Sequence, residues 1–130
     1  MRLPRKHTMK KRADFQKVRE TGRSKAGRFL VLSTLEDAQL PHFMVAFITT
    51  KKTGKAHDRN LLRRRFRDII QRHLPQIQPS LRYLVVIARY NTIQASFAEL
   101  ELDWLKTARR LGILQAPSST ATPLLSAQPS

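Results

Sequence analysis

The side chains best suited to chemistry in this sequence are the lysines, arginines and asparagine of residues 51–68. A helix over residues 57–73 would gather an apolar stripe on one side, formed by Leu62, Phe66, Ile69, Ile70 and His73. The arc beside that stripe would present permanently charged guanidinium groups, which match phosphate oxygens two at a time. Its members are Arg59 at the edge of the stripe and then Asn60, Arg63, Arg64 and Arg67.

The charge on this arc has one sign. A solvated helix face usually mixes acids and bases and forms pairs between residues four apart. Here Arg63, Arg64 and Arg67 lie together with no acid among them. Concentrated like charge repels itself unless a polyanion accepts it. The pattern therefore favours a nucleic-acid-binding surface over an ordinary solvated face.

The sequence indicates no self-sufficient protein active site. Such a site needs a nucleophile–base pair, a pair of carboxylates or a metal cluster. There are no cysteines, no HExxH motif and no phosphate-cradling glycine motif, and the histidines are scattered over different elements as His7, His42, His57 and His73. The acids Glu99, Glu101 and Asp103 cluster near the start of the last predicted helix, where negative charge suits the helix dipole. We therefore expect no catalytic side chains and no metal ligands.

Composition bounds the class of protein. A length of 130 residues allows one domain, and a net charge of +16 with a pI near 11.6 indicates a polyanionic partner. Residues 1–28 hold 11 lysines and arginines and residues 51–73 hold 9, whereas residues 29–50 hold none. No apolar run approaches the roughly 18 residues of a membrane span, and the basic N-terminus lacks the apolar segment of a secretory signal. We expect a cytoplasmic protein that assembles its basic surface by folding.

Periodicity and turn residues predict the elements of the first half of the chain. A helix over about 9–21 would begin at a cap on Thr8 and end at Gly22. Two strands over residues 28–35 and 43–50 are joined by a short polar connection. They would pair as antiparallel neighbours in a hairpin or meander.

In the second half, the nearly continuous apolar run of residues 83–88 predicts a strand in the centre of the sheet. The last helix would cover about 96–111, because Ser96 and Glu99 form a capping box at its start. Trp104 has helical spacing with its apolar neighbours, so we expect it to pack in the core. We also expect His73, which lies on the apolar stripe of the central helix, to be packed and not to act as a ligand.

These elements predict an α/β fold of the α+β sandwich type, with helices packed against a sheet. Their order is helix, strand pair, basic helix, central strand and C-terminal helix. Residues 1–114 would form a single RNA-binding domain, and residues 115–130 would form a disordered tail rich in proline and serine.

The stretch from Lys51 to Asp68 resembles the signature of the protein subunit of bacterial-type ribonuclease P, approximately K-K-x-G-K-A-x-x-R-N-R-x-K-R-x-x-R-E. The matching residues are Lys51, Lys52, Gly54, Lys55, Ala56, Arg59, Asn60, Arg64 and Arg67, with Arg63 and Asp68 as conservative replacements. The resemblance extends to residues 10–18, which are similar to the basic first helix of the family, and to the strand at residues 85–89. It covers about residues 5–113.

The resemblance implies a subunit of a ribonucleoprotein endonuclease that removes the 5′ leader from precursor tRNA. In that family the chemistry belongs to the catalytic RNA and its Mg²⁺, and we expect one monomeric protein per RNA and no membrane partner. The RNA-contacting set would be Lys51, Lys52, Lys55, Arg59, Asn60, Arg63, Arg64 and Arg67. The cleft for the 5′ leader would include Phe15, Arg19 and Arg89, with additional basic surface from Lys10, Lys11, Arg12 and Lys17. The family fold also implies a left-handed βαβ crossover through the central helix.

Three residues depart from the family pattern. Leu61 stands where the motif has its second arginine, and the helical wheel predicts that it is exposed beside Asp68 and Arg72. Arg19 and Ser33 stand where family members often place aromatic residues. We therefore expect leader binding here to depend more on charge and less on stacking.

Other classes of protein share parts of this pattern. A structural RNA-binding protein, such as a ribosomal component, would have the same basic surface and no part in cleavage. A DNA-binding module fits less well, because Asn60 is the one amide among arginines and suits backbone contacts better than base readout. A membrane-surface role is the weakest alternative, because a globular core needs the apolar stripe of the helix.

Overall fold

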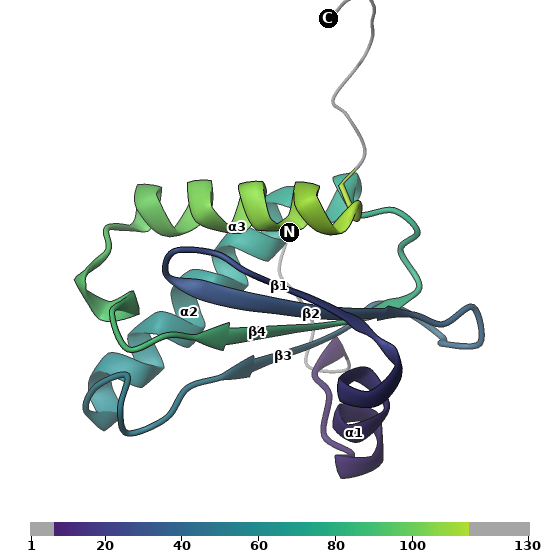
Figure 1. The fold of residues 1–130 in the computed structure, drawn as a ribbon, viewed down its shortest axis with the longest axis horizontal. Coiled ribbons are helices and arrows are strands. Elements are labelled where there is room, and N and C mark those ends of the chain that lie inside the picture. Colours follow the sequence, from purple (N-terminus) through teal and green to yellow (C-terminus); the bar gives the residue numbers. More distant parts are fainter. Residues whose placement is uncertain (1–6, 115–130) are drawn as a thin grey trace, which may run out of the picture.

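The protein, described by a computed structural model over residues 7–114, forms a four-stranded sheet with three α-helices packed on its faces (Figure 1). The elements in chain order are α1 (Arg12–Thr21), β1 (Arg23–Ala26), β2 (Leu30–Glu36), β3 (Met44–Ile48), α2 (Ala56–His73), β4 (Arg82–Ala88) and α3 (Phe97–Leu111). The fold class is therefore the α+β sandwich that the sequence predicts. The predicted tail, residues 115–130, and the first six residues of the predicted domain lie outside the described residues.

The strands are ordered β1-β2-β4-β3 across the sheet. β1 with β2 and β2 with β4 are antiparallel, whereas β3 and β4 are parallel and are joined through α2. The predicted βαβ unit is present. The left-handedness of its crossover stays a prediction from the family. β4 lies in the interior of the sheet, as its apolar sequence predicts, and its first five residues are all buried.

The predicted hairpin between the strands at 28–35 and 43–50 is wrong. β4 lies between β2 and β3, so these two strands are not neighbours. β4 carries apolar side chains on both faces, and its place between two strands puts most of them where both faces of the sheet are covered. β2 pairs instead with β1, a strand that the sequence analysis missed because all four of its residues are exposed and polar or small.

The start of α1 also differs from the prediction. The helix begins after Lys11, which is its N-cap, and not after Thr8. Thr8 forms a parallel bridge with Val45, and the Met9 amide donates to the Val45 carbonyl at 2.8 Å. Met9 is buried. Pairing of this segment with the outer edge of β3 therefore removes an apolar side chain from water, and a helix that began at residue 9 would not form this pairing.

The helices form two layers. α2 and α3 cover one face of the sheet, where the main core includes Phe66, Trp104, Leu30 and Leu84, all fully buried. The predicted apolar stripe of α2 is confirmed at its four aliphatic and aromatic positions. α1 lies on the other face, and Val18 is its one buried residue (Figure 1).

Candidate nucleic-acid interface

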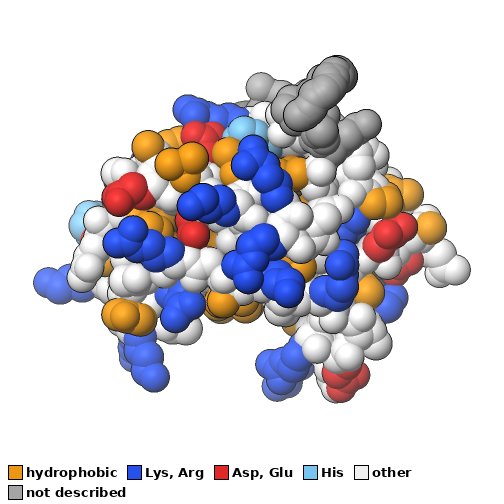
Figure 2. Space-filling view, turned by 45° about the horizontal axis from the view of Figure 1, so that its top comes forward, with side chains coloured by type: hydrophobic (Ala, Val, Ile, Leu, Met, Phe, Trp, Pro, Cys, Tyr) orange, Lys and Arg blue, Asp and Glu red, His pale blue; other side chains and the backbone are white. Residues whose placement is uncertain are grey.

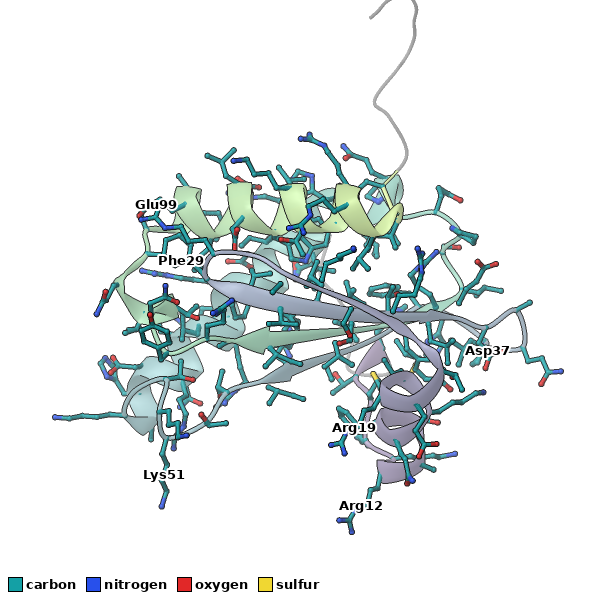
Figure 3. The ribbon with its side chains drawn as sticks, in the orientation of Figure 1. Arg12, Arg19, Phe29, Asp37, Lys51 and Glu99 are labelled. Carbon is teal, nitrogen blue, oxygen red and sulfur yellow. The ribbon has the colours of Figure 1, made fainter. Side chains whose placement is uncertain are left out.

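The loop before α2 folds around a buried threonine. Thr53 is 2% exposed; its amide donates to the Thr50 carbonyl at 2.9 Å, and its Oγ1 accepts from the Thr50 amide at 3.3 Å. This turn leaves Lys51 and Lys52 exposed, and Lys51 extends away from the body of the protein (Figure 3). The sequence motif identified the lysines but not the threonine that holds the loop.

Gly54 and Asp58 start the basic helix. Gly54 has a φ of +154°, and a Cβ there would lie 3.0 Å from the Asp58 Cβ, so the position requires glycine. Asp58 Oδ2 accepts from the Lys55 amide at 3.3 Å, which satisfies a donor at the start of α2. Arg59 Nη1 donates to the Gly54 carbonyl at 3.0 Å and ties the helix back to the loop.

Two arginines of α2, Arg63 and Arg67, are held in place by neutral partners. Arg63 Nη1 donates to Thr49 Oγ1 at 2.7 Å, and its Nη2 also contacts Asn60 Oδ1. The Arg67 guanidinium lies over the Phe47 ring, 5.7 Å from its centroid. These contacts direct the basic side of α2 toward the end of β3.

The positive charges of this surface are not neutralised by carboxylates among residues 7–114. Within residues 7–114, none of the eight side chains of the predicted RNA-contacting set forms a salt bridge with a carboxylate. Arg64 and Arg67 are exposed, as are the three lysines of the set. We call these eight residues the α2 cationic face: Lys51, Lys52, Lys55, Arg59, Asn60, Arg63, Arg64 and Arg67. A surface with fixed, uncompensated guanidinium groups is suited to binding a polyanion.

Leu61 lies beside this face. The predicted exposure is wrong, because the side chain is half-buried. With His57, Asn60 and Arg64 it lines a shallow depression of about 290 Å³. Position 61 therefore adjoins the cationic side chains, as the family motif implies.

The proposed leader residues do not all lie together. Phe15 is half-buried against the cluster under α1, and Arg19 is exposed on the same helix (Figure 3). Arg89 lies beyond the other end of β4, six residues from Tyr83, or about 20 Å along a strand. Its Nη1 donates to the Gly27 carbonyl at 3.1 Å. α1 covers only one end of this sheet face (Figure 1), and side chains such as Ser33 and Ile87 are half-exposed along the rest.

Polar contacts that the sequence did not reveal attach α1 to the sheet. The Tyr83 hydroxyl donates to Asp14 Oδ1 at 3.2 Å, and Lys17 Nζ pairs with Asp37 Oδ2 at 2.9 Å. The hydrogen bond with Asp37 raises the pKa of Lys17, and the same bond lowers the pKa of Asp37. Burial raises the pKa of the Tyr83 hydroxyl. Lys17 therefore serves as an attachment of α1.

The other predicted basic residues near α1 are free to meet a partner. Lys10, Lys11 and Arg12 are exposed. Lys10 and Lys11 line a depression of about 400 Å³, whose wall includes Tyr83 and His42.

Two further features concern metals and membranes. Residues 7–114 contain no group of three or more histidine, aspartate or glutamate side chains placed to hold a metal ion. Within the same residues, no helix has the length and apolar character needed to cross a bilayer. His73 packs on Trp104 with ring centroids 5.8 Å apart, which confirms that it is packed, although it is half-buried and lies at the margin of the core.

The mixed α+β fold and the α2 cationic face define a class: small basic proteins equipped to bind a polyanion. Residues 3–112 match the family model described as Ribonuclease P, and the chain belongs to the ribonuclease P protein family. The family that the resemblance predicts is confirmed. The family comprises protein components of a tRNA-processing ribonucleoprotein nuclease.

Named relatives agree with this assignment. The chain is 33% identical over 113 residues to the ribonuclease P protein component of Geobacillus kaustophilus, covering 87% of this chain and 93% of that protein. It is 38% identical over 102 residues to the component of Thermus thermophilus, covering 78% of this chain and 57% of that protein. Among solved structures, the RNase P protein of Staphylococcus aureus has a TM-score of 0.77 at 26% identity, covering 84% of this chain and 98% of that chain.

Proposed function

We propose that this protein binds the catalytic RNA of ribonuclease P through the α2 cationic face and the 5′ leader of precursor tRNA through the sheet face beside α1. The RNA then removes the leader to give the mature 5′ end. The observation that carries the proposal is the α2 cationic face itself: eight clustered side chains without carboxylate partners among the described residues, in a member of this family.

The contacts of α2 support binding of the RNA backbone. Thr49 and Phe47 hold the guanidinium groups of Arg63 and Arg67 before RNA arrives, so less side-chain freedom is lost on binding. Each guanidinium has five N–H donors, and these contacts leave several of them for phosphate oxygens. Asn60 accepts from Arg63, which occupies the amide oxygen that would otherwise read a base edge. The face is therefore suited to holding phosphates rather than reading sequence.

The leader would follow the partly open sheet face. Phe15 offers a stacking or packing surface at the α1 end, and Arg19 adds a cation beside it. Arg89 adds a second cation beyond the far end of β4, so a single-stranded leader of several nucleotides would reach both. With aromatic residues absent at 19 and 33, charge would supply most of the leader affinity.

Catalysis is assigned to the RNA partner. Mg²⁺ bound by the RNA would supply the activation of water and the charge neutralisation of phosphodiester hydrolysis. The protein would contribute the positions of catalytic RNA and leader relative to each other. We propose one monomeric protein per RNA in a cytoplasmic assembly.

The test is cleavage of a precursor tRNA by a catalytic ribonuclease P RNA at low Mg²⁺, with and without the protein. We expect protein-dependent cleavage at the mature 5′ end, because the protein adds binding energy that the RNA alone must obtain from more Mg²⁺. Tight RNA binding without stimulation of cleavage would contradict the proposal and favour a structural RNA-binding protein of the ribosomal kind.

A further inference from the structure

A second group of cations meets at the sheet edge formed by β1. Arg23 Nη2 donates to the Leu111 carbonyl at 2.8 Å, and Arg110 Nη1 donates to the Ala26 carbonyl at 3.1 Å. These reciprocal bonds join β1 to the C-terminal half of α3, although the two segments are more than 80 residues apart. We call the exposed cations of this junction the α3–β1 basic surface: Arg23, Lys25, Lys106, Arg109 and Arg110.

The acids of α3 are engaged by groups other than these cations, and Glu99 caps the helix at Ser96. Glu101 lies in the first half of the helix, where it contacts His73 and Arg72. Asp103 is buried and accepts from two backbone amides of the turn between β1 and β2. Within the described residues no member of the α3–β1 basic surface forms a salt bridge. Figure 2, which brings α3 toward the viewer, shows lysine and arginine side chains gathered over the middle of this face, where they outnumber the acidic side chains seen among them.

Local effects explain these cations one at a time but not their gathering. Arg109 and Arg110 lie in the last turn of α3, where positive charge suits the helix dipole. Arg23 and Lys25 lie on an edge strand, where charged side chains discourage pairing with another chain. Neither effect requires all five cations to share one surface, and like charges placed together repel each other without a polyanion.

The α3–β1 basic surface is separated from the α2 cationic face. β1 and β3 form the two opposite edges of the sheet, about 14 Å apart at three strand spacings. The α2 cationic face lies near β3, because Arg63 and Arg67 contact Thr49 and Phe47. Both α2 and α3 pack on the same face of the sheet, whereas the proposed leader path follows the other face.

We propose that the α3–β1 basic surface binds the sugar–phosphate backbone of a second helical segment of the catalytic RNA, so that the protein joins two segments of one RNA. This inference rests on the proposed function. The catalytic RNA is the fitting partner because α2, which would bind it, shares a sheet face with α3. The exposed residues of β1 and α3 include no aromatic side chain, so the surface suits a base-paired helix, recognised by its backbone, and not unstacked bases.

The first test measures how affinity for the catalytic RNA depends on salt. The double variant Lys106→Gln with Arg109→Gln removes two exposed cations and leaves the hydrogen bonds of Arg23 and Arg110 intact. We expect the slope of log K against log salt to become shallower by about 1.4–1.8 for two lost phosphate contacts. The matched control exchanges the two residue types, Lys106→Arg with Arg109→Lys, and keeps the wild-type slope. An unchanged slope in the first variant, at an unchanged melting temperature, would overturn the proposal.

The second test locates the RNA segments in the assembled holoenzyme. The chain contains no cysteine, so one introduced cysteine can carry a tethered iron chelate that cleaves nearby RNA. Leu102→Cys places the probe one turn before Lys106 at a side chain that is 60% exposed, and His57→Cys places it beside the α2 cationic face at a side chain that is 86% exposed. We expect the two probes to cleave two separate segments of the catalytic RNA.

The alternative outcomes are distinct. Three results with the Leu102→Cys probe would overturn the second-segment proposal and leave the proposed function standing. They are no cleavage, cleavage of precursor tRNA alone, and cleavage of the same RNA segment that the His57→Cys probe cleaves. Failure of both probes to cleave the catalytic RNA would contradict the proposed function itself.

Discussion

At the scale of single residues, the α2 cationic face depends on neutral partners that fix charged groups. Arg63 is held by the Thr49 hydroxyl and Arg67 by the Phe47 ring, and neither contact cancels the charge. The helical wheel predicts which arginines share a side of α2, because helical spacing alone determines it. The partners could not be predicted, because Thr49 and Phe47 reach the helix only through the packing of β3.

Leu61→Arg should tighten binding to the catalytic RNA. Leu61 adjoins Asn60 and Arg64, so an arginine there would add a cation to the same surface. We expect the salt slope to steepen by about 0.7–0.9 for one added phosphate contact. Binding titrations at several salt concentrations would measure it, with Leu61→Gln as the uncharged control. Equal affinity and slope for both variants would remove position 61 from the interface.

Gly54→Ala should destabilise the loop before α2. The φ of +154° is strained for alanine, and the new Cβ would press on Asp58. We expect a loss of about 1–3 kcal/mol in the free energy of unfolding, measured by chemical denaturation. The control is Ala56→Gly, which makes the reverse exchange two residues later in the chain. A stability equal to wild type would show that the loop does not need this backbone conformation.

At the scale of elements, α1 is attached by the buried Val18, by the half-buried Phe15 and by polar contacts. Tyr83→Phe removes the hydroxyl that donates to Asp14 and keeps the ring. We expect a loss of about 0.5–1.5 kcal/mol and faster hydrogen exchange in α1, with exchange in α2 unchanged. Tyr90→Phe, at an exposed tyrosine, is the control. Unchanged exchange in α1 would mean that other contacts hold the helix.

The turn between β1 and β2 depends on one carboxylate of α3. Asp103 Oδ1 accepts from the Arg28 amide at 2.9 Å, and Oδ2 accepts from the Phe29 amide at 2.8 Å. The position of Asp103 in the sequence indicates only a helix-dipole role, because nothing local reveals a partner more than 70 residues away. Its role is to join α3 to the sheet.

Asp103→Asn should therefore lower the free energy of unfolding, although asparagine has nearly the same shape as aspartate. The amide group that replaces one oxygen cannot accept, so one backbone N–H loses its partner in a buried site. We expect a loss of about 1–3 kcal/mol in the free energy of unfolding. The exposed Asp68→Asn should change it by less than about 0.5 kcal/mol. Equal effects from the two substitutions would contradict this role for Asp103.

At the scale of the whole molecule, the sequence predicts which helices and strands form better than it predicts which strands pair. The capping box of Ser96 and Glu99 is confirmed, with the Glu99 amide donating to Ser96 Oγ at 3.2 Å, because such caps are local. The interior place of β4 is confirmed because burial on both faces shows in its composition. The pairing of β2 with β1 could not be predicted, because β1 has no apolar pattern and is defined by hydrogen bonds alone.

If the α2 cationic face binds the catalytic RNA through its charge, the affinity must depend on salt. The most direct measurement is the salt dependence of affinity for that RNA, for wild-type protein and for Arg64→Ala, whose side chain is exposed and without a carboxylate partner among residues 7–114. We expect Arg64→Ala to bind more weakly, with a slope shallower by about 0.7–0.9 for one lost phosphate contact. Lost affinity with an unchanged slope, or no change in either, would contradict this mode of binding.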